Sequence, residues 1–319
     1  MQSLRCIAVD LGGTQIRAAR YTVAGVLEAR VSMPTSAQEG VVAVSQRIKS
    51  VIRQVWPPEI PVAGIGIGLP GILDYKRGIV LKSPNLPGWL DVPLRDKLLD
   101  AFHVPVFMGN DMHLAALAEH RFGAGHGVSN MVYLALGAGI GGGMILNDTL
   151  FTGGHGMGAE IGHVTLDMQG PRCHCGRRGC LEMLASGAAI ARHARECLER
   201  GDDSLLRALV DGDLSQITAQ EVGIAAQQGD ALAQAVFTEA GRYIGMALVN
   251  LMYLLNPDLF VLGGDVLRAG DVLLSQIQET VTDLAPDIYR EQTRIVPAAL
   301  WEDVGLWGAL ALVLMELDL

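Results

Sequence analysis

The chain has 319 residues, half of them hydrophobic, and a formal net charge of −10 at pH 7. This length accommodates two domains, each with its own core. The 24 Lys and Arg residues form no run, which argues against a nucleic-acid partner because phosphate-backbone binding requires a basic surface. No uncharged stretch is long and uninterrupted enough to cross a bilayer, so no membrane partner is expected.

The first glycine cluster lies in Cys6–Thr22, CIAVDLGGTQIRAARYT. An apolar strand ends at Asp10, a Gly12-Gly13-Thr14 turn follows and alternation then resumes, which predicts a hairpin. The segment lacks the glycine spacing of dinucleotide-binding and P-loop motifs. The turn can instead offer backbone N–H groups and the Thr14 hydroxyl to a phosphate, while Asp10 holds a magnesium ion through water.

Three further elements are predicted before the next glycine cluster. Val41–Val55 is an amphipathic helical run, and Val62–Gly71 contains an apolar strand. The strand VPVFMGN ends at Asn110, and the helical run DMHLAALAEHRF begins at Asp111. Asp111 therefore lies at a strand-to-helix switch, where an aspartate serves either chemistry or the N-cap of the helix.

The second glycine cluster, Met131–Leu146, repeats the strand, glycine turn and strand of the first. Such turns also occur as simple structural bends. The matching context of the two nevertheless predicts a duplicated fold, with a phosphate loop in each half and a ligand cleft between the halves.

A dense cysteine and histidine cluster follows between Glu160 and Glu182. Three cysteines and one preceding histidine supply four ligands for a tetrahedral zinc ion: His163, Cys173, Cys175 and Cys180. Four protein ligands leave no open coordination position, so the predicted zinc is structural and positions the loop around it.

Two alternatives to this zinc site concern its cysteines and its histidine. A disulfide requires an oxidising compartment, and the start of the sequence shows no secretory signal, so reduced thiols and a cytoplasmic location are expected. His174 is a rival ligand, disfavoured because it would point away from its neighbours in an extended C-x-C turn. Cys6 and Cys197, in a predicted strand and a predicted helix, are expected to be buried.

Taken together, the motifs resemble those of the ROK family of sugar kinases and repressors, within the actin, hexokinase and sugar kinase superfamily. The resemblance runs over nearly the whole chain. It rests on D-x-G-G-T (Asp10–Thr14), G-x-G-x-P-G (Gly66–Gly71), N-L-P-G-W (Asn85–Trp89), N-D (Asn110–Asp111), L-G-x-G-I-G-G-G (Leu136–Gly143), E-x-G-H (Glu160–His163), C-x-C-G-x-x-G-C-x-E (Cys173–Glu182) and N-P-D-x-x-V-L-G-G (Asn256–Gly264).

The resemblance implies a two-lobed α/β fold of the actin-like ATPase, ribonuclease H-like type, with the ligand cleft between the lobes. The smaller lobe is expected to span residues 1–118 and to be completed by a C-terminal helix, 300–319, while the larger lobe spans 119–299 and carries the zinc loop. The apolar, glycine-marked helix predicted at Arg242–Leu255 can pack against a second subunit, so a homo-oligomer, dimer or tetramer, is expected.

The implied activity is ATP-dependent phosphorylation of a hexose, with glucose as the first choice and Asp111 as general base. The sugar hydroxyls are assigned to Asn85, Asn110, Asp111, Glu160, His163 and Glu182. ATP and Mg²⁺ are assigned to Asp10, Gly12, Gly13, Thr14, Gly137, Ala138, Gly139, Gly263 and Gly264. Two of these residues have a purely structural alternative to sugar binding. Glu182 can be a solvated carboxylate at a helix start, and Asn85 can be a turn-forming asparagine.

Three residues depart from the family pattern. Ala138 replaces a threonine, which removes a hydroxyl donor from the second phosphate turn, and Asp265 replaces a third glycine near the expected adenosine site. Ala159 replaces a glycine, a change expected to be tolerated unless the backbone there has a positive φ.

Several alternatives in function stay open. The acceptor can be N-acetylmannosamine, mannose, fructose or allose instead of glucose, and the protein can be a non-catalytic sugar sensor. Polyphosphate as donor is disfavoured by the acidic balance, because a long polyanion requires a basic groove. Repressors of the family carry a winged-helix DNA-binding domain before the D-x-G-G-T hairpin. Only nine residues precede Asp10 here, so a repressor role is disfavoured.

Overall fold

The computed structural model describes residues 4–269 and 271–319. Contacts within the chain divide it into two compact units. Unit 1 comprises residues up to Ser129, Gly143–Ala159 and Ala299–Leu319, and unit 2 comprises Asn130–Gly142 and Glu160–Ala298. Helix α3 (Asp111–Phe122) and the segment 143–159 fall in unit 1. The predicted smaller lobe, by contrast, consisted of residues 1–118 and the C-terminal helix.

Unit 1 contains β1 (Arg5–Leu11), β2 (Gln15–Thr22), β3 (Leu27–Pro34), η1 (Ala37–Glu39), α1 (Gly40–Val55), β4 (Val62–Leu69), β5 (Ile72–Asp74), β6 (Ile79–Lys82), β7 (Leu90–Val92), α2 (Leu94–Phe102), β8 (Val106–Asn110), α3 (Asp111–Phe122), β11 (Thr149–Phe151), η5 (Trp301–Asp303) and α11 (Val304–Glu316). The predicted first hairpin, the helix at 41–55, the strand at 62–71 and the helix beginning at Asp111 are confirmed as β1–β2, α1, β4 and α3.

Unit 2 contains β9 (Met131–Leu136), η2 (Ile161–His163), α4 (Leu181–Ala185), α5 (Gly187–Glu199), α6 (Leu206–Leu209), η3 (Leu214–Gln216), α7 (Ala219–Gln227), α8 (Ala231–Leu255), β12 (Leu259–Gly263), η4 (Asp265–Ala269), α9 (Asp271–Leu284), α10 (Asp287–Arg290) and β13 (Arg294–Pro297). Strand β10 (Ile140–Leu146) contains the division between the units. None of the helices in the described part of the chain is both long and apolar enough to span a membrane.

Two five-stranded sheets follow the same plan. One has the order β3-β2-β1-β4-β8 and the other β11-β10-β9-β12-β13, which is 3-2-1-4-5 in both when the strands are counted along the chain. In each sheet the last two pairings are parallel. The repeated order confirms the duplicated α/β fold that the two glycine hairpins predicted. A separate three-stranded sheet has the order β5-β6-β7.

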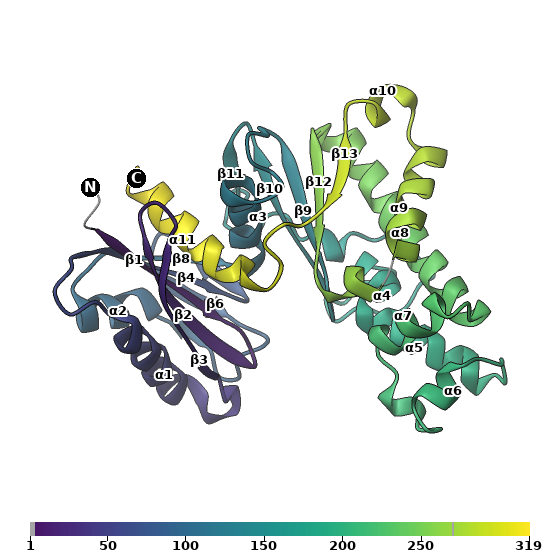
Figure 1. The fold of residues 1–319 in the computed structure, drawn as a ribbon, viewed down its shortest axis with the longest axis horizontal. Coiled ribbons are helices and arrows are strands. Elements are labelled where there is room, and N and C mark those ends of the chain that lie inside the picture. The colour runs from purple at the N-terminus through teal and green to yellow at the C-terminus, as the bar shows by residue number, and fades with distance from the viewer. Residues whose placement is uncertain (1–3, 270) are drawn as a thin grey trace. The chain divides into compact units, whose positions relative to one another are not determined.

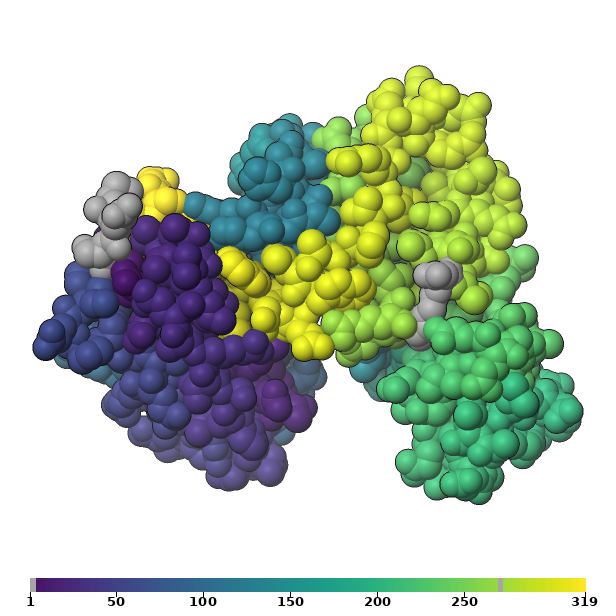
Figure 2. Space-filling view, in the orientation of Figure 1, coloured from purple at the N-terminus to yellow at the C-terminus, as the bar shows by residue number. Residues whose placement is uncertain are grey.

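Helices cover both faces of the sheet in unit 1 (Figure 1). On one face, α1 packs its buried stripe of Val44, Ile48 and Ile52 against the strands, as the helical repeat of apolar residues requires. On the other face, α11 packs against β1, and the yellow C-terminal segment lies directly on the purple N-terminal strands (Figures 1 and 2). Close approach is possible because β4 carries Gly66, where a Cβ would lie 2.0 Å from the Ala309 carbonyl oxygen.

Candidate active site and metal centre

The turn of the first hairpin is fixed by hydrogen bonds that use its carbonyl groups. Thr35, which is fully buried, donates its N–H to the Thr14 oxygen at 2.8 Å and its hydroxyl to the Gly12 oxygen at 2.7 Å. The Gly12 N–H donates to the Gln15 oxygen at 2.9 Å. Asn85 lies beside this turn, since a Cβ on Gly13 would be 3.4 Å from the Asn85 Cβ. Thr35 is outside every recognised motif, and sequence reasoning missed it.

Asp10 forms an ion pair that the sequence analysis did not anticipate. The Arg17 Nε donates to the Asp10 Oδ2 at 3.0 Å, and both side chains are largely buried. The carboxylate also lies at the start of α11, because a Cβ on Gly305 would be 2.6 Å from the Asp10 Cγ. Both surroundings favour a negative charge. The signal for Arg17 was present in the hairpin register, in which Asp10 and Arg17 are direct partners.

Asn110, rather than Asp111, caps the N-terminus of α3. Its Oδ1 accepts hydrogen bonds from the N–H groups of Met112 at 2.9 Å and His113 at 3.2 Å. Its Nδ2 donates to the Gly71 oxygen at 3.3 Å, which joins the N-D pair to the G-x-G-x-P-G loop. The N-cap alternative for Asp111 is therefore wrong, and Asp111 is the first residue of the helix, where its carboxylate meets the positive end of the helix dipole.

His113, the third residue of α3, is buried and contacts two other segments. Its Nε2 lies 2.9 Å from the Gly158 carbonyl oxygen, and its Nδ1 lies 3.1 Å from the Tyr75 hydroxyl. Because a carbonyl only accepts, Nε2 carries the proton and Nδ1 accepts from Tyr75. The start of α3 is thereby tied to the segment that precedes the E-x-G-H motif.

Glu119, on the same helix, is a fully buried carboxylate that sequence reasoning also missed. It accepts hydrogen bonds from the N–H groups of Ala124 at 2.8 Å, Ala299 at 3.0 Å and Leu300 at 2.8 Å. Three donors compensate the burial of its charge. The chain is therefore fixed to α3 where it enters the last segment of unit 1.

Ala159 stands where the family pattern has a glycine, and its φ is +62°. Alanine is therefore strained at this position. A left-handed conformation costs a non-glycine residue about 1–2 kcal/mol. We expect Ala159→Gly to raise the free energy of unfolding by about 0.5–1 kcal/mol, measured by urea denaturation. Ala235→Gly, on the exposed face of α8, is the control and should lower it by about 1 kcal/mol. A loss of stability in Ala159→Gly would contradict the strain.

The turn of the second hairpin is held by the start of α5. The Gly187 N–H donates to the Gly137 oxygen at 2.8 Å, and the Ala188 N–H donates to the Ala138 oxygen at 3.4 Å. Both turn carbonyls therefore face the helix. As in the first hairpin, contacts from outside the turn use its carbonyl oxygens, while the first N–H of the turn donates within it, here from Gly137 to the Gly139 oxygen at 2.9 Å. The N–H groups that follow it, of Ala138 and Gly139, are the ones suited to an anion.

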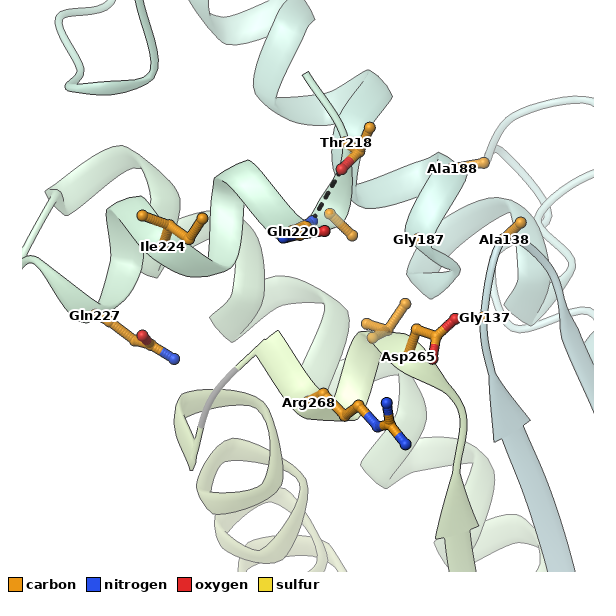
Figure 3. A pocket seen from close by; sticks show the side chains of 12 residues that line it. Gly137, Ala138, Gly187, Ala188, Thr218, Gln220, Ile224, Gln227, Asp265 and Arg268 are labelled. Atoms are coloured by element: carbon orange, nitrogen blue, oxygen red, sulfur yellow. Dashed lines mark hydrogen bonds between the residues drawn. The ribbon is translucent and has the colours of Figure 1, made fainter. Parts of the chain in front are cut away.

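A cavity of about 670 Å³ adjoins this turn in unit 2. Its lining comes from the β9–β10 turn, the start of α5, the length of α7 with its N-cap residue, and η4: Gly137, Ala138, Gly187, Ala188, Thr218, Ala219, Gln220, Ile224, Gln227, Asp265, Val266 and Arg268. Figure 3 shows Asp265 and Arg268 projecting from η4, with α7 on another side of the space. Only Gly137, Ala138 and Asp265 were singled out from the sequence. The helix starts were missed because they carry no phosphate-binding motif of their own.

Gly263 is the last residue of β12, and Gly264 connects it to η4; both lie directly before Asp265 in sequence but outside the lining of the cavity. Gly264 has a φ of +92°, and a Cβ there would lie 2.4 Å from the Leu136 oxygen. This glycine therefore allows the β12–η4 connection to pass close to the end of β9.

The four predicted zinc ligands lie together in unit 2. One ring nitrogen of His163 and the sulfurs of Cys173, Cys175 and Cys180 all lie within 4.8 Å of one another. The Cys175 and Cys180 sulfurs are 3.6 Å apart, and the Cys173 sulfur is 3.7 Å from the His163 Nδ1. A tetrahedral zinc site places two sulfurs about 3.8 Å apart and a sulfur and nitrogen about 3.5 Å apart. The donor set fits Zn²⁺, and His174 is exposed outside the cluster.

Arg177 shapes the electrostatics of this cluster. Hydrogen bonds from its backbone and side chain lower the pKa of the Cys175 thiol to about 6, whereas burial raises the pKa of Cys180 to about 12. The Arg177 guanidinium also donates to the His163 carbonyl at 2.5 Å. A thiolate is the form that binds a metal, so Arg177 favours the ligand form of Cys175 and fixes the histidine segment.

The predicted sugar ligands are distributed over both units. Unit 1 carries Asn85, Asn110 and Asp111, and unit 2 carries Glu160, His163 and Glu182. Glu160 is exposed, directly before η2. Glu182 lies in the first turn of α4, and its Oε2 accepts a hydrogen bond from the Ile140 N–H at 3.0 Å. It is thus a hydrogen-bond partner of the second hairpin and not a solvated helix-start carboxylate.

The sequence model of the ROK family matches residues 6–316 of the chain. The chain is 37% identical to a glucokinase from Thermotoga maritima over 98% of both chains. Among solved structures, it resembles a ROK hexokinase from Thermus thermophilus with a TM-score of 0.82 and 34% identity, over 98% of this chain and 99% of the other. It also resembles a ROK family glucokinase from Streptomyces griseus in complex with glucose and AMPPNP, with a TM-score of 0.81 and 33% identity, over 96% and 97%.

These matches span the chain almost from end to end, and the family match over residues 6–316 covers the positions of every motif on which the resemblance rested. The solved structures share the duplicated α/β arrangement of sheets and helices, so the predicted actin-like fold class is confirmed. The chain belongs to the ROK family.

Proposed function

We propose that the protein phosphorylates glucose with ATP to give glucose 6-phosphate and ADP. The observation that carries this proposal is the match along 96% of the chain to a glucokinase structure holding glucose and AMPPNP. The near full-length identity with the Thermotoga maritima glucokinase supports the same assignment. Glucose is thus favoured over the other hexoses that the motifs admit, and catalysis over a non-catalytic sensor.

In this proposal Asp111 accepts the proton of the attacking sugar hydroxyl. Transfer of the γ-phosphoryl requires little covalent help from the protein, so the enzyme's task is to position the nucleophile and to stabilise the negative charge. With Asn110 capping the helix, the Asp111 carboxylate is not needed as the cap. The sugar oxygen attacks the γ-phosphorus, its proton passes to Asp111 and ADP leaves.

The remaining sugar hydroxyls are assigned by proposal to Asn85, Asn110, Glu160, His163 and Glu182. Carboxylates and amides suit this task because a site built around polar groups rejects analogues that leave those groups unpaired. His163 serves both sites in this scheme, since its Nδ1 faces the cysteine cluster and its Nε2 is the nitrogen left for a hydroxyl.

The phosphates of ATP are assigned to the two glycine turns, Gly12–Thr14 and Gly137–Gly139, and the adenosine to the cavity beside the second turn. Ala138 offers no hydroxyl, so its contribution is the backbone N–H. Asp265 lines the cavity, and a carboxylate there suits a ribose hydroxyl better than a phosphate. Asp265 is therefore assigned to a ribose hydroxyl.

Magnesium is assigned to Asp10, whose carboxylate fits a hard cation. The Arg17 hydrogen bonds both end on Oδ2, so the other oxygen remains suited to a water ligand of the ion. Bound Mg²⁺ neutralises phosphate charge during transfer. Zinc is assigned a structural role at His163, Cys173, Cys175 and Cys180.

A hexose panel with ATP and Mg²⁺, followed by coupled ADP production, tests the assignment of the substrate. We expect the highest kcat/KM for glucose, with N-acetylmannosamine, mannose, fructose and allose each lower. A higher kcat/KM for another hexose would replace glucose as the substrate. ADP production that does not depend on any sugar would contradict the kinase assignment.

A further inference from the structure

We propose that the zinc loop, Glu160–Glu182, holds the second phosphate turn in place, and that Glu182 is a positioning residue for nucleotide binding. This inference rests on the proposed function, because it takes the turn Gly137–Gly139 as a phosphate-binding element. Glu182 would then position the turn for nucleotide binding, in addition to its proposed contact with the sugar.

The first contact joins Glu182 to the end of the turn. Ile140 is the first residue after the turn, and its N–H donates to the Glu182 Oε2 at 3.0 Å. The same oxygen lies so close to Gly139 that a Cβ there would be 2.4 Å away. The carboxylate therefore packs directly on the backbone of the turn, and a side chain at position 139 would collide with it.

The second contact comes from the opposite end of the zinc loop. Gly162 lies against Ile140, since a Cβ on Gly162 would be 2.0 Å from the Ile140 carbonyl oxygen. Ile140 itself is 5% exposed. Its N–H and its carbonyl are thus both covered by the zinc loop, one at each end.

The metal ligands adjoin both contact points. His163 directly follows Gly162, and Cys180 lies two residues before Glu182 and is the N-cap residue of α4. The two ends of the loop are paired through the Leu181 N–H to the Val164 oxygen at 2.9 Å and through a Thr165–Cys180 bridge. A zinc ion that joins His163 to Cys180 would fix the distance between the two contacts on Ile140, as a metal fixes the segments that carry its ligands.

The turn needs such support because it must present N–H groups to phosphate without reorganising. Its carbonyl groups at Gly137 and Ala138 accept hydrogen bonds from the start of α5. The N–H of Ile140, directly after the turn, donates to Glu182. Loss of the Glu182 contact would leave the start of β10 able to move. Affinity for the phosphates would then fall even when no sugar is bound, because ordering the turn would oppose binding.

The test measures binding of AMPPNP with Mg²⁺ by calorimetry in the absence of sugar, where a role in sugar binding has no effect. We expect Glu182→Ala to raise the Kd about tenfold, the order of one lost charge-assisted hydrogen bond. Glu182→Gln should stay within about threefold, because its amide oxygen can still accept from Ile140. Glu199→Ala, at an exposed carboxylate at the end of α5, is the matched control and should leave this Kd unchanged.

A double-mutant cycle isolates the contact itself. Gly139 has no positive φ, so Gly139→Ala is conformationally permitted and should weaken AMPPNP binding only by displacing the Glu182 carboxylate. In a Glu182→Ala background the added methyl meets no carboxylate, and the second substitution should have little further effect. If Glu182→Ala does not fold, the Kd of the Gly139→Ala variant still tests the contact, because that variant retains the Glu182 carboxylate.

Removal of zinc by a chelator should also raise the AMPPNP Kd without sugar. Unchanged Kd values in Glu182→Ala, in Gly139→Ala and after chelation would overturn the inference while leaving the kinase assignment intact. A native protein that binds no AMPPNP and does not phosphorylate glucose would overturn the proposed function instead.

Discussion

Asp111→Asn should abolish turnover while leaving the protein able to bind sugar. The amide keeps the shape of the side chain but cannot take up the hydroxyl proton, and loss of a general base costs about 10²–10⁴ in kcat. The fold should be unaffected, because Asn110 provides the helix cap. Measurement of kcat by coupled ADP production and of glucose Kd by calorimetry separates the two effects, with the Kd expected within about tenfold of native.

Two comparisons make this result specific to Asp111. Asn110→Ala should lower the free energy of unfolding by about 1 kcal/mol, the typical cost of a lost N-cap, whereas Asp111→Asn should not. Near-native turnover in Asp111→Asn would remove Asp111 from the role of base. A loss of stability equal to that of Asn110→Ala would mean that Asp111 supports the helix instead.

The second large effect is expected at the metal centre. If His163, Cys173, Cys175 and Cys180 form a closed zinc site, the purified protein should contain one zinc per chain. Cys175→Ser should lose that zinc and more than about 4 kcal/mol of stability, as expected when a structural metal is lost. The sugar KM should rise with it, because Glu160 and Glu182 flank the loop that the metal holds.

Cys197→Ser is the matched control for this substitution. Cys197 is buried on α5, outside the cluster, so its variant should retain one zinc per chain. Elemental analysis and thermal unfolding of both variants decide the question. A native protein without zinc, whose stability responds to reductant but not to chelator, would show that the cysteines form a disulfide and would contradict the metal site.

Local patterns were sufficient to predict much of the fold. The two glycine hairpins, the helix that begins at Asp111 and the proximity of the cysteines all depend on residues close in sequence. A turn needs glycine at particular positions, and a strand or helix needs its own repeat of apolar residues. These requirements can be read without knowledge of the tertiary structure.

The support of the site could not be predicted, because it comes from residues distant in sequence. Thr35 is an ordinary threonine until it is placed beside the Gly12–Thr14 turn, and Glu119 shows its role only when Ala299 and Leu300 lie against it. The choice between Asn110 and Asp111 as helix cap depended on one residue of register. Such contacts arise from packing, which local propensity does not determine.

Ala159 is an intermediate case. The family pattern identified the position as unusual, but the strain depends on φ, which only the structure provides. Glu182 is similar, because the motif predicted a sugar contact and gave no sign of the bond to Ile140. In both cases the sequence located the residue and the structure showed what it does.

The most direct test of the central claim is to identify the product formed from glucose, ATP and Mg²⁺. Phosphorus and proton NMR of the reaction mixture would locate the transferred phosphoryl group on the sugar. The account predicts glucose 6-phosphate and ADP in equal amounts, with no product in the Asp111→Asn variant. ADP formed without a sugar phosphate, or glucose left unphosphorylated while a different hexose is converted, would contradict it.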